Sequence, residues 1–100
     1  MALKIVGRPG TTFEAVMPSQ DVLDELETLG VTRLKFTPVI NNVSVVFPGS
    51  VSAYEALKIR EMFDRQFCGR SGWKQPPAFY EAGEDDDVPA GSIVLWGQTH

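Results

Sequence analysis

The chain has 100 residues, of which 43% are hydrophobic and 22% are charged, a balance typical of one small globular domain with a single apolar core. Its net charge of −4 does not favour a general affinity for nucleic acid, which usually needs a basic face. Its one cysteine, Cys68, excludes an intramolecular disulfide.

Two strands joined by a turn are expected at the start of the chain. Leu3 to Val6 and Thr12 to Met17 are rich in β-forming residues. Between them, Gly7-Arg8-Pro9-Gly10 is typical of a turn, because proline fixes φ and glycine permits a positive φ. The two strands are therefore predicted to pair as a hairpin.

A first helix is predicted from Ser19 to Gly30. Ser19 is a favourable N-cap residue, and Gly30 stands where a glycine commonly ends a helix. Between them, one apolar stripe falls at helical spacing and consists of Val22, Leu23, Leu26 and Leu29.

A second hairpin is predicted from Val31 to Phe47. In its first strand, Leu34 and Phe36 alternate with Arg33, Lys35 and Thr37, which indicates a half-buried strand with a basic outer face. Asn41-Asn42 is compatible with a two-residue turn into the second strand, Val43 to Phe47.

The longest helix is predicted to begin after a cap at Ser50 or Ser52 and to end near Cys68. Its apolar residues follow the spacing of one helix face and are Ala56, Ile59, Phe63 and Phe67. Arg60 and Asp64 lie one turn apart and are expected to form a half-buried pair.

Residues 69–91 are interpreted as one long loop, with at most a short strand around Phe79 and Tyr80, because they contain glycines, paired prolines and an acidic run. Ser92 to Trp96 is predicted to be the last strand. Together these elements predict one α+β domain over residues 1–100, with a mostly antiparallel sheet of four to five strands and two helices on one face. A ferredoxin-like βαββαβ order with an extra N-terminal strand is one form of this fold.

The first turn is also a candidate anion site, formed by Arg8, Gly10, Thr11 and Thr12. Its Arg-Pro-Gly resembles part of the Asp-Arg-Pro-Gly that follows the first strand of ACT-type amino-acid-sensing domains. Here Gly7 replaces the acidic residue, and Phe13 to Pro18 separate the turn from the helix. The alternative is a plain turn.

Arg70, Trp73 and Lys74 are a candidate partner-binding group, because Trp and Arg are frequent interface hot spots. The alternative is that Trp73 packs on the core. A reactive Cys68 is less favoured than a packed thiol, because the dipole at a helix C-terminus opposes a thiolate. No catalytic residue is therefore assigned.

Glu84-Asp85-Asp86-Asp87 is most simply a solvated loop. It lacks the alternating spacing of a calcium loop, and one cysteine with one terminal histidine cannot close a metal site, so neither a metal nor a cofactor is expected. A second interpretation joins these acids with those of the first helix into an extended acidic face that binds a basic groove.

The leading hypothesis is a non-enzymatic protein that binds another macromolecule through an acidic and aromatic surface, as a phage- or plasmid-type accessory or inhibitor protein does. The residues expected to contact the partner are Arg70, Trp73, Lys74, Phe79, Tyr80, Glu84, Asp85, Asp86 and Asp87. The alternative is a regulatory domain that binds a small molecule or anion, such as a nucleotide or an amino acid.

The expected partner is a protein rather than a nucleic acid or a membrane, and a homodimer through an exposed edge strand is a further alternative. The lone cysteine fits a reducing compartment. The N-terminal apolar stretch is too short for a signal peptide, and none approaches the roughly 20 residues of a membrane span. We therefore expect a cytoplasmic location, in the source cell or in a host.

Overall fold

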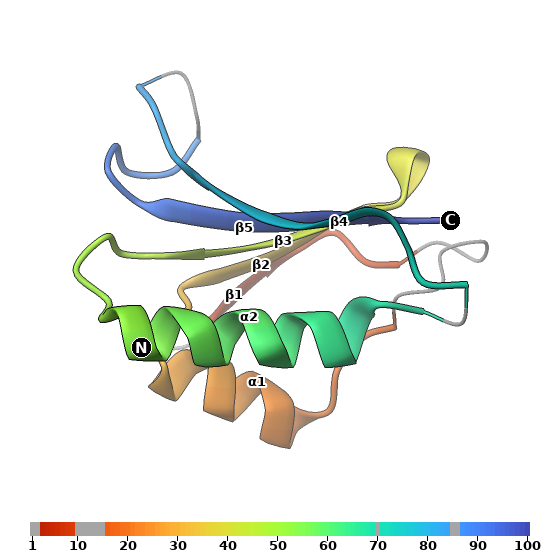
Figure 1. Cartoon of the computed structure of the whole chain (residues 1–100), viewed down its shortest axis with the longest axis horizontal. Coiled ribbons are helices and arrows are strands. Elements are labelled where there is room, and N and C mark those ends of the chain that lie inside the picture. The colour runs from red at the N-terminus through yellow and green to blue at the C-terminus, as the bar shows by residue number, and fades with distance from the viewer. Residues whose placement is uncertain (1–2, 10–15, 70, 85–86) are drawn as a thin grey trace.

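The chain folds into two layers, a five-stranded mixed sheet and a pair of helices that cover one of its faces (Figure 1). The computed structural model describes residues 3–9, 16–69, 71–84 and 87–100. In chain order the elements are β1 (Lys4–Val6), α1 (Gln20–Thr28), β2 (Arg33–Thr37), the 3₁₀ helix η1 (Pro38–Ile40), β3 (Asn42–Phe47), α2 (Ala53–Phe67), β4 (Trp73–Glu81) and β5 (Ile93–Thr99). The predicted α+β class with two helices on one face is confirmed.

Both helices begin at the serine caps that the sequence predicts. The Ser19 hydroxyl accepts a hydrogen bond from the Val22 amide at 3.4 Å. Ser52 forms a complete capping box with Glu55, in which each side chain accepts a bond from the other residue's backbone amide. Gly30 follows the end of α1 with a φ of +112°, a conformation that favours glycine.

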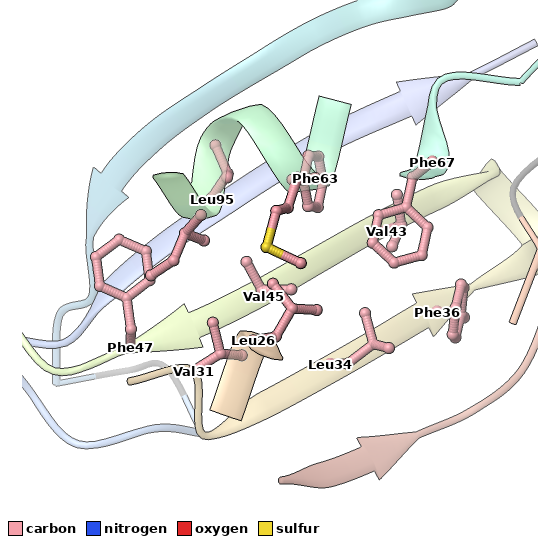
Figure 2. Close-up of a cluster of buried hydrophobic side chains, with 12 residues drawn as sticks. Leu26, Val31, Leu34, Phe36, Val43, Val45, Phe47, Phe63, Phe67 and Leu95 are labelled. Carbon is pink, nitrogen blue, oxygen red and sulfur yellow. The ribbon is translucent and has the colours of Figure 1, made fainter. Parts of the chain in front are cut away.

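The core lies between the helices and the inner face of the sheet (Figure 2). Ile59, Phe63 and Phe67 of the predicted apolar stripe of α2 are buried there. Leu26 is the residue of α1 that is buried in the same core. Phe67 packs edge-on against Phe36 and Phe63, with ring centroids 5.8 and 5.3 Å apart. Aromatic rings buried in this way are the largest apolar contribution to the stability of a small core.

The predicted N-terminal hairpin is wrong, because β1 pairs with a strand other than the predicted one. β1 pairs in parallel with β2, with Ile5 opposite Leu34, and α1 forms the crossover between them. Its expected partner, residues 12–17, lies mostly outside the described residues, and Val16 and Met17 at its end are not in a strand. Pairing across a crossover depends on long-range contacts, which a short strand does not encode locally.

The sheet order β1-β2-β3-β5-β4 also differs from the ferredoxin-like arrangement. In a split βαβ unit, another strand lies between the two parallel strands. β5 separates β3 from β4 in this way, but β1 and β2 pair directly. Only the second of the two crossover units is therefore split.

The connection between β2 and β3 is longer than the predicted two-residue turn. Thr37 pairs with Asn42, and η1 with Asn41 fills the space between them. Asn41 has a φ of +52°, so the asparagine does adopt the left-handed conformation that the sequence suggests.

The predicted loop over residues 69–91 is wrong in its extent, because nine of its residues form β4, which includes the short strand expected around Phe79 and Tyr80. Pro76 and Pro77 cannot donate ladder hydrogen bonds, which argues against a central strand but is compatible with an edge. β4 is at the edge of the sheet, and its register with β5 shifts twice before Ala78. The remaining connection, residues 82–92, is about half as long as predicted.

Trp73, the first residue of β4, is part of the inner layer. Its ring stacks on Phe63 with centroids 5.5 Å apart and parallel planes, and its Nε1 donates a hydrogen bond to Asp64 Oδ1 at 2.6 Å. Asp64 is thus bonded to Trp73 and not to Arg60, so the predicted Arg60–Asp64 pair is wrong. Gly97 lies beneath the indole ring: a Cβ at Gly97 would approach Trp73 Cζ3 to 2.5 Å.

We predict that Gly97→Ala destabilises the fold by about 1–3 kcal/mol, the usual cost of overpacking a well-packed site. The indole ring cannot move away cheaply, because Phe63 and Asp64 hold it in place. Urea unfolding followed by circular dichroism measures the change. Gly83→Ala is the control, because a Cβ there would meet nothing within 4 Å. Equal stability of the two variants would contradict this packing.

Candidate functional site

The sheet face opposite the helices is the candidate site, and we call it the open face. Strand pairing places three rows of side chains on it, Arg33–Val46–Val94–Tyr80, Lys35–Ser44–Trp96–Ala78 and Thr37–Asn42–Gln98–Gln75. In the first row, Val46 and Val94 are buried and pack with Ala82 of the β4–β5 connection. Residues on the other side of the same strands, such as Leu34, Val45 and Leu95, are fully buried in the core. Neither helix covers the open face (Figure 1).

The open face carries a hollow of about 370 Å³. In Figure 1, η1 and the connection between β4 and β5 both project from the sheet on the side away from the helices. Ile40 of η1 and Asp87 of that connection line the hollow at its two ends, and Lys35, Ser44 and Trp96 lie between them. The hollow is therefore a concave strip of sheet between two raised ends.

The hollow combines apolar rings with polar groups. Tyr80 and Ile40 are 45% and 50% exposed, and Trp96 is half-buried beside Ser44. Lys35, also half-buried, is opposite Ser44 on the other side, and it forms no ion pair with a described residue. A half-buried Trp and an exposed Tyr next to hydroxyl groups and cations are typical of an interface centre.

An ion pair closes one end of the hollow. Arg33 Nη1 donates a hydrogen bond to Asp87 Oδ1 at 2.9 Å, with the arginine side chain 13% exposed and the aspartate 73% exposed. This hydrogen bond, and then the charge of the guanidinium, hold the pKa of Asp87 below its ordinary value. The pair joins β2 to the β4–β5 connection, and the charge of Lys35 also contributes to the lowered pKa of Asp87, although Lys35 forms no ion pair with a described residue.

The structure distributes the predicted partner-binding residues over both sides of the sheet. Trp73 packs on the core, which is the alternative that the sequence left open. Phe79 faces the helix side, where its ring meets Phe47 edge-on at 6.2 Å. Tyr80 and Asp87 line the hollow, whereas Lys74 and Glu84 are exposed outside it. Arg70, Asp85 and Asp86 lie outside the described residues.

The predicted extended acidic face is wrong for the residues described. Asp87 lines the open face, while the acids of α1 belong to the layer that packs on the opposite face. The sheet therefore separates the two groups. In the candidate anion site, Arg8 is exposed, and Gly10, Thr11 and Thr12 lie outside the described residues.

Two main residues of the hollow, Lys35 and Trp96, are absent from the predicted site. The alternation of β2 does place Lys35 on a basic outer face. Trp96 ends an uninterrupted apolar run, Ile93 to Trp96, in which no polar residue marks the outer positions. If Leu95 is buried, the alternation of side chains along a strand places Trp96 on the outer face. The sequence alone does not show which residue of the run is buried.

Residues 3–9, 16–69, 71–84 and 87–100 contain no group of three or more His, Cys, Asp or Glu placed to hold a metal ion. Cys68 is the half-buried C-cap residue of α2. No helix within these ranges is both long and apolar enough to cross a bilayer. Comparisons with family profiles, curated proteins and solved structures found no match.

We predict that the Asp87–Arg33 pair stabilises the fold above about pH 4 and not in strong acid. The pKa of Asp87 is lowered on folding from 3.8, so its contribution is present above the unfolded value and lost as the pH falls through the folded value. The unfolding free energy of Asp87→Asn, measured in urea between pH 2 and 7, should fall below the wild-type value at neutral pH and converge with it in acid.

Glu84→Gln is the matched control for this experiment, because it removes a neighbouring charge that is not bonded to Arg33. NMR titration of the Asp87 carboxyl group gives the direct measurement. Its midpoint should rise in Arg33→Gln. A midpoint that does not change between wild type and Arg33→Gln would contradict the pair.

Proposed function

We propose that this chain is a non-enzymatic binding protein and that its open face is the surface that recognises a protein partner. The observation that carries the proposal is the hollow itself, in which Trp96, Tyr80 and Ile40 surround polar strand residues on a sheet face that the helices leave uncovered. An antiparallel sheet in water usually turns a polar face outward. Here the β4–β5 connection buries Val46 and Val94 through Ala82, whereas Tyr80 and Ile40 stay 45% and 50% exposed and are free to contact a partner.

Binding energy in protein interfaces is concentrated in a few central residues, most often Trp, Tyr and Arg, surrounded by groups that exclude water. The open face has this composition. It also stands on strands, which hold side chains more rigidly than loops do. Rigid aromatic anchors lose little conformational entropy when a partner binds.

Each more specific part of this proposal is supported by one or two features of the chain. A phage- or plasmid-type accessory or inhibitor protein is supported by the small size of the domain and by the absence of an assigned catalytic residue. A cytoplasmic location is supported by the single cysteine. Homodimerisation through an edge strand is less favoured, because β4 carries two prolines and β1 is only three residues long.

Site-specific photocrosslinking in the source cell tests the proposal. A photoreactive phenylalanine analogue is placed at Tyr80, on the open face, or at Tyr54, which is 69% exposed on α2. We expect a discrete protein adduct from position 80 that Trp96→Ala abolishes, and no adduct from position 54. Circular dichroism of each variant confirms that it is folded.

Adducts at position 54 alone would move the interface to the helices. There, a second hollow of about 330 Å³ lies between α1 and α2 and is lined by Leu29, Tyr54 and Met62. Equal adducts at both positions would indicate non-specific contact. Either result contradicts an interface on the open face.

The alternative, a regulatory domain for a small molecule or anion, is favoured by one observation. The volume of the hollow, about 370 Å³, is within the range of small-molecule sites, roughly 300–1,000 Å³. Lys35 would be the group that holds an anion.

Thermal unfolding with nucleotides, amino acids and inorganic phosphate separates the two functions. A ligand present at 100 times its Kd would add about 2.7 kcal/mol to the unfolding free energy. A protein-binding function predicts no shift with any of these compounds. A shift that Lys35→Gln removes would favour the small-ligand function instead.

A further inference from the structure

We propose that the partner segment is acidic, and that it places a carboxylate on Lys35 and an apolar side chain against Trp96. This inference deepens the proposed function and rests on it, because it names the chemistry of the partner that the open face recognises. Its basis is the distribution of charge between the two sides of the sheet, together with the spacing of one row of strand residues.

The open side of the strands and α1 differ in charge, whereas α2 carries three acids and three Lys or Arg residues. Three cations face the open side of the strands, namely Lys4, Arg33 and Lys35, and the paired strand positions on that side contain no acid. α1, in the layer on the other side, carries four acids and no Lys or Arg. A chain of net charge −4 thus presents three cations on the open side of its strands, against Asp87 at the end of the hollow, and complementary potential favours a carboxylate at Lys35.

Asp87 compensates Arg33, which is held within 2.9 Å of it. Lys35 has no such partner among the described contacts and lies within the hollow. A cation that is already half-buried is stabilised more by an incoming carboxylate than a fully exposed one is, because screening by water is weaker there. Lys35 is therefore the cation within the hollow that forms no ion pair with a described residue and can contact a partner.

The row Lys35–Ser44–Trp96 sets the spacing between the two contacts. Neighbouring strands lie about 4.8 Å apart, so the backbones that carry Lys35 and Trp96 are about 10 Å apart. Ser44 lies between them and offers a hydroxyl to the polar backbone of a bound segment. A peptide that carries an acid and an aromatic or aliphatic residue at this separation matches the row.

A basic and aromatic sheet face is also a feature of single-stranded nucleic-acid binders. The surroundings of this one disfavour such a ligand. Of the residues that line the hollow, two are cations, and one of them, Arg33, is already paired with Asp87. Affinity for nucleic acid also requires several Lys or Arg contacts, whereas one cation here is neutralised by Asp87 and one, Lys4, lies on the edge strand β1.

Peptide display tests the proposal with the whole chain. A random peptide library is selected against the wild type, against Lys35→Glu, and against Lys58→Glu as the charge-matched control on the helix side. Lys58 is exposed on α2, where it lies over the Tyr54 ring. We expect wild type and Lys58→Glu to enrich peptides that pair Asp or Glu with an aromatic or aliphatic residue, and Lys35→Glu to lose the preference for acids.

A synthetic peptide of the enriched sequence then gives the magnitude by fluorescence anisotropy. Its Kd should weaken by at least roughly tenfold in Lys35→Glu, because like charges at a contact are repulsive. It should also weaken in Trp96→Ala and stay unchanged in Lys58→Glu. Circular dichroism shows that each variant is folded.

Four results would overturn the inference: no enriched sequence, enrichment without acids, a preference for acids that survives Lys35→Glu, or salt-dependent binding of a labelled oligothymidylate that Lys35→Glu removes. The last would assign the face to nucleic acid. A protein adduct from position 80 that Lys35→Glu leaves intact would retain the proposed function while removing this inference. If the analogue at position 80 forms no protein adduct in a chain with no other substitution, the proposed function itself is contradicted.

Discussion

The packing of α2 against the inner face of the sheet is the contact on which the rest of the structure depends. α2 connects β3 to β4, which lie on opposite sides of β5, so its position determines where the last two strands can pair. Phe63 stacks on Trp73, the first residue of β4, and Trp73 in turn lies over Gly97 of β5. The helix, the edge strand and the inner strand are thus held together by one stack.

This stack also decides what the open face presents. Side chains alternate along a strand, so a slip of one residue would exchange the buried and exposed sets of every strand involved. With Leu95 in the core, Trp96 must face outward, and with Leu34 in the core, Lys35 must do the same. The strand residues of the candidate site therefore follow from core packing. The register that buries Leu34 and Leu95 also fixes which neighbouring side chains face outward.

The sequence predicts those parts of the fold whose determinants are local. Ser19, Ser52 and Gly30 mark helix ends through side-chain or backbone chemistry within one turn, and the α2 stripe repeats often enough to be unambiguous. β1 and β4 depend instead on distant partners. β4 in addition contains Pro76 and Pro77, which by themselves indicate a loop and are tolerated only because the strand is at an edge.

The candidate site was predictable only in part for the same reason. Arg33 and Lys35 follow from alternation within β2, but the bond between Arg33 and Asp87 joins residues 54 positions apart. The positions of Trp73 and Trp96 do not follow from their neighbours in the sequence. Trp73 follows a helix among polar residues and yet packs on the core, whereas Trp96 ends an apolar strand and yet faces outward.

The net charge of a small protein does not predict the charge of its partner when the surfaces on the two sides of its sheet carry charges of opposite sign. The total of −4 disfavours polyanions at long range, but a docked partner responds to the potential of the surface it contacts. The acids of α1 and the cations of the strands lie on opposite sides of a thin sheet. An acidic segment would be repelled by α1 and attracted to Lys35 in the hollow, so this separation of charge would orient such a partner toward the open face.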